Sequence, residues 1–134
     1  AKLQDLIGYL LYKKIIAIFG LAFKAGTNDV RTSLSLRVIE QLRRGGAVIR
    51  AHDPIAIPEA RTIKPNIEYY NDPYEAVHRA DALLILTDWP EFRELDWGKI
   101  KRWMASSNLV DGKNLLEPVV MKKLGFRYRG IGRS

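Results

Sequence analysis

The apolar positions of this chain form short continuous runs separated by amphipathic stretches. Ile15–Phe19 and Ala82–Leu86 are apolar throughout, which is typical of strands buried on both faces of a sheet. The same pattern, in weaker form, predicts four further strands, at residues 47–51, 67–70, 108–110 and 126–128.

The stretches between these strands predict helices. Residues 33–44 form a helix that ends at Gly45-Gly46, with an apolar stripe of Leu34, Val38, Ile39 and Leu42. Asp72-Pro73 is a helix start with Asp as N-cap and Pro at the first helical position. Asp96 and Pro118 open two more helices, whereas residues 57–65 are interpreted as irregular with a short helical turn at Pro58.

This alternation of strands and helices predicts the fold class. We expect an α/β domain, a three-layer Rossmann-like parallel sheet of five or six strands with helices on both faces. At 134 residues the chain is long enough to bury one core. Residues 2–12 place leucines and an isoleucine at helical spacing, so residues 1–12 are predicted to end a connecting helix and residues 13–134 to form the α/β domain.

Composition narrows the possible functions. The net charge of +7 favours anionic partners, although a basic balance describes steering rather than fold. The chain has no cysteine, which excludes disulfides, thiolate metal sites and a cysteine nucleophile within it. No run approaches 18 apolar residues, so we expect no membrane span, and a cytoplasmic location is the default expectation.

The loop after the first strand carries the candidate chemistry. It contains Lys24 and Arg31 close to the start of the next helix, where the helix dipole disfavours cations. Capping by Asp29, Thr32 or Ser33 does not explain these two cations, so the loop predicts an anionic ligand, most plausibly a phosphate.

The usual dinucleotide fingerprint is missing from this loop. Gly20 and Gly26 are separated by five residues and do not form G-x-G-x-x-G, which argues against NAD binding by this domain in the usual Rossmann manner. Asp53 ends the second strand, where a ribose-binding acid would lie, but it precedes Pro54 and fits a turn equally well.

Several segments together resemble the C-terminal domain of the UDP-glucose and GDP-mannose dehydrogenase family. The first is the long motif Gly-Leu-Ala-Phe-Lys-x-x-Thr-x-Asp-x-Arg-x-Ser at residues 20–33, followed by Asp53-Pro54. Residues 87–92 resemble the family's Thr-(Asp/Glu)-Trp-x-Glu-Phe loop. Residues 110–114 and 130–132 resemble its Asp-Gly-Arg-Asn segment and its tail, with Lys113 where the family usually has Arg.

The resemblance implies a function and a division of labour. Enzymes of this family oxidise the C6 hydroxyl of a nucleotide sugar to a carboxylate with two NAD⁺. Other domains, an N-terminal NAD-binding domain with the catalytic Cys and a helical dimerisation segment, would supply what this chain lacks. By resemblance, Phe23, Lys24 and Lys113 would contact the UDP-sugar and Arg31 would reach toward the NAD, with no catalytic residue and no metal ligand in this chain.

Some alternatives stay open at this point. Phe23 is as consistent with a core residue as with a ligand contact, and Trp89 and Phe92 could line a ligand pocket or cover the sheet. His52 and His78 lack metal-ligand spacing and are better explained as surface or hydrogen-bonded core residues. A basic nucleic-acid-binding domain or a structural interaction module is the rival function. However, the basic residues are scattered over several predicted helices without interleaved aromatics, so nucleic acid is not the expected partner.

Overall fold

The computed structural model describes residues 11–22, 24–31 and 33–130. The predicted helix over residues 2–12 falls largely outside this part, and its last positions, Leu11 and Tyr12, are not helical. Phe23, one of the predicted ligand residues, also lies outside the described residues.

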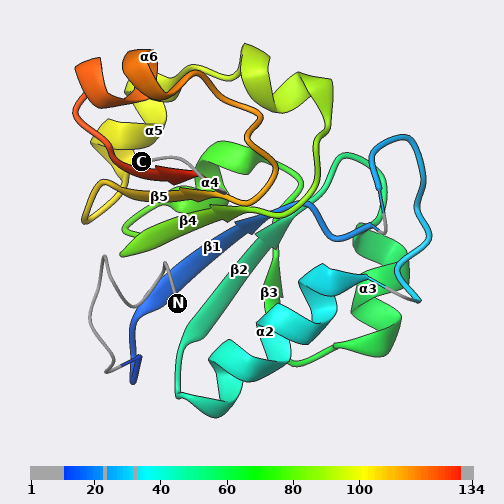
Figure 1. Ribbon diagram of the computed structural model, residues 1–134. Helices are drawn as coiled ribbons and strands as arrows, with labels where there is room; N and C mark the ends of the chain where they lie inside the picture. Colours follow the sequence, from blue (N-terminus) through cyan, green and yellow to red (C-terminus); the bar gives the residue numbers. More distant parts are fainter. Residues whose placement is uncertain (1–10, 23, 32, 131–134) are drawn as a thin grey trace.

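The centre of the domain is one parallel sheet of six strands in the order β3-β2-β1-β4-β5-β6 (Figure 1). Every neighbouring pair is parallel, and Phe19 at the end of β1 aligns with His52 on β2 and Ile85 on β4. This order confirms the predicted Rossmann-like class. The strands are β1 (Ile15–Phe19), β2 (Val48–His52), β3 (Glu68–Tyr69), β4 (Ala82–Ile85), β5 (Asn108–Asp111) and β6 (Arg127–Gly130).

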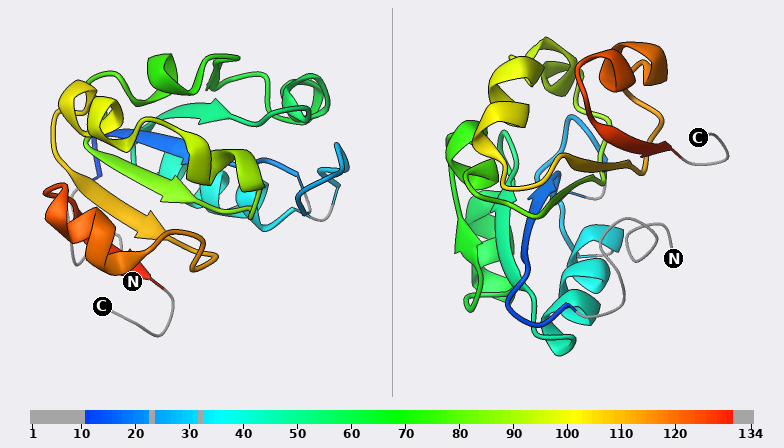
Figure 2. Two further views of the ribbon diagram at one scale, coloured as in Figure 1. Left: turned by 90° about the horizontal axis from the view of Figure 1, so that it is seen from above. Right: turned by 90° about the vertical axis from the view of Figure 1, so that its left-hand side faces the viewer.

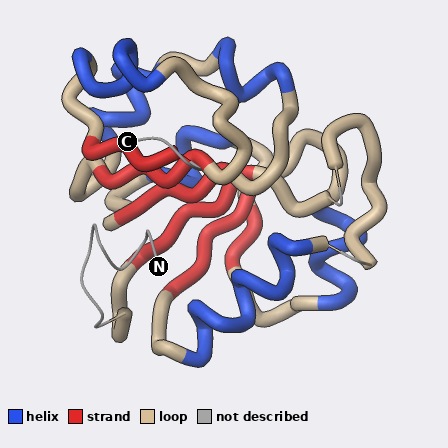
Figure 3. The backbone as a smooth tube through the Cα atoms, in the orientation of Figure 1, coloured by secondary structure: helices blue, strands red, loops and turns tan. Residues whose placement is uncertain are grey.

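Helices cover both faces of the sheet, as predicted (Figures 2 and 3). On one face lie α2 (Leu34–Arg44) and α3 (Ile57–Ile63). On the other lie α4 (Pro73–Val77), the 3-10 helix η1 (Pro90–Glu94), α5 (Trp97–Trp103) and α6 (Pro118–Lys123).

The alternation along β1 explains this division. Ile16 and Ile18 point toward α2 and α3, whereas Ala17 and Phe19 point toward α4, η1 and α5. Each of these four side chains is completely buried, so β1 is a central strand covered on both faces.

The predicted helix starts are confirmed at three caps. The side chains of Ser33, Asp72 and Asp96 accept hydrogen bonds from the backbone N–H of Ser35, Tyr74 and Lys99, respectively. Each cap satisfies a donor that the helix itself cannot satisfy.

Two local predictions were wrong. The stretch 57–65 was expected to be irregular with only a short helical turn at Pro58, but the helix α3 forms there, with Pro58 in its first turn and Ile57 and Ala60 buried. In α2, Leu34 was expected in the apolar stripe, yet it is exposed and Leu36 is buried instead. Leu34 is the first helical residue, so its position depends on how the preceding loop enters the helix.

Candidate functional site

The carboxyl ends of the strands meet at one edge of the sheet, where the strand order reverses between β1 and β4. Open α/β sheets bind ligands at this switch point. The loops that follow β1, β4 and β5 therefore form the candidate site, and they include Lys24, Trp89 and Lys113.

The loop between β1 and α2 carries an exposed ion pair. The Arg31 guanidinium donates from Nε and Nη2 to the two carboxylate oxygens of Asp29, each at 3.1 Å. The side chains are 83% and 36% exposed. Hydrogen bonds from the Arg31 side chain, and next from its backbone N–H, hold the pKa of Asp29 below its usual range. Arg31 is thus on the surface, and among the described residues its ion-pair partner is the solvent-accessible Asp29.

Lys24 and Lys113 are the other two cationic residues that were predicted to contact the ligand. Lys24 is exposed on the β1–α2 loop, and Lys113 is exposed on the loop between β5 and α6. Neither makes an ion pair with any of the residues that the structure describes. Both ammonium groups are therefore accessible to an anion at this edge.

Asp53 is buried directly beneath the β1–α2 loop. Its Oδ2 accepts from the backbone N–H of Leu21 at 2.8 Å and of Ala22 at 3.2 Å, and from the indole Nε1 of Trp89 at 3.2 Å. Its Oδ1 accepts from the N–H groups of Ile55 and Ala56, both at 2.9 Å. With five donors and 2% exposure, this carboxylate is engaged on both oxygens and cannot serve as a ribose-binding acid in this arrangement.

Asp111, at the end of β5, is a second buried carboxylate that accepts hydrogen bonds from a loop at this edge. Its carboxylate accepts from the backbone N–H groups of Lys113, Leu115 and Leu116 and from the Tyr128 hydroxyl. Asp111 and Tyr128 are both essentially inaccessible to solvent. The backbone that carries Lys113 is therefore held from inside the domain.

The aromatic residues of the β4 loop belong to the core rather than to a pocket. Phe92 is 1% exposed and its ring packs against Phe19 at 5.3 Å between centroids. Trp89 is 7% exposed and donates to Asp53. Of the two alternatives considered from the sequence, covering the sheet is the one observed.

His52 is also buried, with its ring close to those of Phe19 and Phe92. Its ring lies 5.7 Å from that of Phe19, and its Nδ1 is 2.9 Å from the carbonyl oxygen of Tyr70. Because a carbonyl can only accept, Nδ1 carries the hydrogen of the neutral ring. Burial lowers the pKa of His52, which keeps it neutral and agrees with the expectation of a hydrogen-bonded core histidine.

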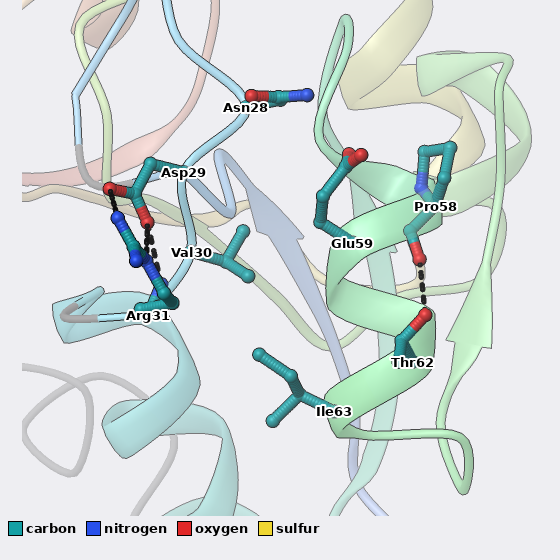
Figure 4. Close-up of a pocket in the computed structure, with 8 residues that line it drawn as sticks. All are labelled: Asn28, Asp29, Val30, Arg31, Pro58, Glu59, Thr62 and Ile63. Atoms are coloured by element: carbon teal, nitrogen blue, oxygen red, sulfur yellow. Dashed lines mark hydrogen bonds and ion pairs between the residues drawn. The ribbon is translucent and has the colours of Figure 1, made fainter.

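An open pocket of about 550 Å³ lies beside this edge, between the β1–α2 loop and α3 (Figure 4). The Asp29–Arg31 pair lines one wall and Glu59 lines the other, whereas Lys24 and Lys113 do not contribute. Of the predicted site residues that the structure describes, Arg31 alone lines this pocket. The remaining lining residues are Asn28, Val30, Pro58, Thr62 and Ile63.

Sequence reasoning missed two features of this site. The α3 wall of the pocket was overlooked because only a short helical turn at Pro58 was predicted there, although Ile57 and Ala60 have helical spacing. Asp53 was interpreted as a possible turn residue, which its bonds from the N–H groups of Ile55 and Ala56 confirm. No local pattern shows that its other partners lie 31 to 36 positions away.

The basic residues of the described helices lie on both faces of the sheet. Arg43 and Arg44 lie on α2 and interact with Glu40, on the opposite side of the sheet from the basic residues of α5 and α6. Among the described residues there is no cluster of three His, Cys, Asp or Glu that could hold a metal ion. None of the described helices is both long and apolar enough to cross a membrane.

Comparison with known proteins gives one consistent result. Residues 17–118 match the model of the UDP-binding domain of the UDP-glucose/GDP-mannose dehydrogenase family. Over 121 residues the chain is 46% identical to the UDP-glucose 6-dehydrogenase TuaD of Bacillus subtilis, and this alignment covers 90% of the chain and 26% of the relative. It is 45% identical to a UDP-glucose 6-dehydrogenase of Pseudomonas aeruginosa, covering 90% of the chain and 28% of that protein.

Solved structures agree with these matches. A UDP-glucose dehydrogenase from Pyrobaculum islandicum superposes with a TM-score of 0.81 at 28% identity, covering 98% of this chain and 28% of that one. An NDP-N-acetyl-D-galactosaminuronic acid dehydrogenase from Methanosarcina mazei superposes with a TM-score of 0.83 at 27% identity, covering 98% and 27%. The chain thus spans about a quarter of the length of the proteins it resembles.

Proposed function

This chain belongs to the UDP-glucose/GDP-mannose dehydrogenase family, and from that membership we propose that it binds the UDP-sugar of an NAD-dependent sugar-nucleotide 6-dehydrogenase. The enzyme would oxidise the C6 hydroxyl of the sugar to a carboxylate, a product suited to polysaccharide biosynthesis in the cytoplasm. The observation that carries the proposal is the match of residues 17–118 to the UDP-binding domain of the family.

The position of the two lysines supports this proposal. Lys24 follows β1 and Lys113 follows β5, and only β4 lies between these strands in the sheet. Neighbouring strands are about 4.8 Å apart, so the two loops start about 10 Å from each other, a span suited to one nucleoside diphosphate. We propose that Lys24, Lys113 and Phe23 contact the nucleotide sugar, with each ammonium acting as a point charge on phosphate.

The other steps of the reaction would be performed elsewhere in the enzyme. The 134 residues contain no cysteine, so a thiol for covalent oxidation must come from another domain. We propose that an N-terminal NAD-binding domain and a dimerisation segment, to which residues 1–12 connect, complete the enzyme. Arg31 would turn toward the NAD on that domain, exchanging its exposed Asp29 partner for a ligand phosphate.

Titration with UDP tests the binding site. We expect a Kd of about 0.1–1 mM for this chain, or on the order of −4 to −5 kcal/mol, because part of the ligand surface belongs to another domain. Amide shifts should concentrate in residues 19–31 and 110–114. Lys24→Ala and Lys113→Ala should each weaken UDP severalfold, whereas the matched change Lys122→Ala on α6 should not. Shifts concentrated on α2, α5 and α6 would contradict the proposal.

A second experiment tests whether the catalytic groups lie outside this chain. The purified 134-residue chain, incubated with NAD⁺ and UDP-glucose, UDP-N-acetylmannosamine or GDP-mannose, should form no NADH. Measurable NADH formation would show that the chain carries catalytic groups of its own.

A further inference from the structure

Asp53 connects three segments that are distant in the sequence. It follows β2, yet its Oδ2 binds the backbone of Leu21 and Ala22 after β1 and the indole of Trp89 after β4. Because β1 lies between β2 and β4 in the sheet, these bonds pass beneath the switch point from one half of the domain to the other.

The bonds reach the β1–α2 loop at its first residues. Gly20 continues the ladder by donating to the carbonyl of His52 at 2.8 Å, and Leu21 and Ala22 then donate to Asp53. Lys24 is only two positions further along. The direction in which the chain leaves β1 toward Lys24 is therefore set by the Asp53 carboxylate.

The packing around this point leaves little freedom for rearrangement. A Cβ added to Gly20, whose φ is +103°, would collide with the side chain of Thr87. Leu21 and Ala22 are 0% and 2% exposed, and Asp53 is 2% exposed. The start of the loop is thus fixed, whereas Asp29 and Arg31 further along it are exposed.

We propose that Asp53 is a positioning residue for nucleotide binding. It does not touch the ligand, since all its acceptor capacity is directed at the protein. It holds the start of the Lys24 loop and the β4 loop in one arrangement, so that the loop does not have to become ordered when the ligand binds. This inference rests on the proposed UDP-binding function.

The expected loss of UDP affinity depends on the fraction of molecules in which the Lys24 loop has its binding arrangement. If the loop adopts its binding arrangement only a tenth of the time, the apparent Kd rises about tenfold. Asp53→Asn offers one acceptor oxygen in place of two and turns an NH₂ group toward backbone N–H donors, so one set of bonds must break. We therefore expect UDP affinity to fall about tenfold in this variant.

Asp81→Asn is the matched control. The Asp81 carboxylate accepts from the backbone N–H of Ile15 at 2.8 Å, but at the opposite, amino end of the sheet. The control variant makes the same exchange of a carboxylate for an amide beside a backbone N–H, but its remaining amide oxygen can keep the single bond from Ile15, and the candidate site stays intact. UDP titrations of both variants are made at a temperature where each is fully folded, and the control should stay within twofold of the unchanged chain.

Two ligand-free measurements keep the proposal testable on its own. In Asp53→Asn, amide shifts and relaxation should show increased motion in residues 24–30 but not on β1, and Asp81→Asn should show no such change. In the unchanged chain, the amide hydrogens of Leu21 and Ala22 should exchange as slowly as those of Ile16 and Ile18, because exchange at all four positions would require global unfolding.

The outcomes are separable. Equal weakening of UDP by both variants, or unchanged affinity in Asp53→Asn, would overturn the positioning role. Fast exchange of the Leu21 and Ala22 amides in the unchanged chain would also overturn the positioning role. This measurement does not depend on whether Asp53→Asn folds. If the unchanged chain bound no UDP, the proposed function would fail, while the motion of residues 24–30 would still show whether Asp53 orders the loop.

Discussion

The carboxyl edge of the sheet has an exposed rim and a buried layer, and charged residues behave differently in the two. In the rim, defined by Lys24, Asp29, Arg31 and Lys113, the side chains are solvent-accessible, and the single ion pair joins two residues of one loop. The buried layer beneath it is defined by His52, Asp53 and Asp111. There the Asp53 carboxylate accepts five hydrogen bonds from three segments of the chain.

This difference between the rim and the buried layer indicates which residues stabilise the fold and which are available to bind a ligand. A buried carboxylate is tolerated only when hydrogen bonds replace its water, so the buried layer must be satisfied by the protein itself. An exposed ion pair contributes little to folding, so its members can change partners at low cost. We infer that the buried layer holds the loops in place and that the rim provides the charges for a ligand.

The largest expected effect is in the buried layer. Asp111→Ala should destabilise the chain by about 3 kcal/mol, because it removes a fully buried carboxylate that accepts hydrogen bonds from several backbone N–H groups and from the Tyr128 hydroxyl. Urea unfolding measures the change. The matched rim variant, Asp29→Ala, should leave the urea midpoint almost unchanged. Similar losses in both variants would remove the distinction between rim and buried layer.

His52 gives the buried layer a pH dependence. Its pKa lies below 6.5 in the folded chain because of burial, so the unfolded chain takes up the proton first as the pH falls. Stability from this group is present above about pH 6.5 and is lost as the pH falls toward the folded pKa, by at most about 1.4 kcal/mol per pH unit.

Urea unfolding between pH 7.5 and 5 should show this loss in the unchanged chain. His52→Gln should be less stable at pH 7.5, since it loses the ring packing against Phe19, but its stability should decline less steeply with falling pH. Parallel pH profiles for the two chains would show that His52 does not titrate differently on folding.

The smallest expected effect on folding is in the rim. Arg31→Ala should move the melting temperature by no more than about 2 °C, because its partner Asp29 remains solvated after the change. In a complete two-domain enzyme the same change should reduce turnover much more than stability. A large drop in melting temperature without ligand would assign Arg31 to the fold rather than to the site.

Much of the fold could be predicted because its signals are local. The apolar run of β1, the cap residues Ser33, Asp72 and Asp96, and the order of strands and helices all follow from patterns within about fifteen residues. The length of α3 was underestimated, since only a turn at Pro58 was predicted, because its short apolar period becomes clear only when Ile57 and Ala60 pack against the sheet.

The site was predictable in its residue types but not in its arrangement. The sequence showed that Lys24 and Arg31 are cations near a helix start, where the helix dipole disfavours positive charge. Both are indeed on the surface loop after β1. It did not show that Arg31 faces α3 across a pocket while Lys24 does not, since this depends on where α3 packs.

The sequence by itself determined the parallel α/β class, the family and the loop that carries the cations, because periodicity, capping and motifs are written in neighbouring residues. Only the tertiary structure decided the roles of Asp53 and Trp89, which are 36 positions apart and are joined by a single 3.2 Å hydrogen bond. The physical reason is that a carboxylate in the sequence does not reveal its donors. Whether it binds a ligand, closes a turn or holds a loop depends on which N–H groups the folded sheet brings within reach.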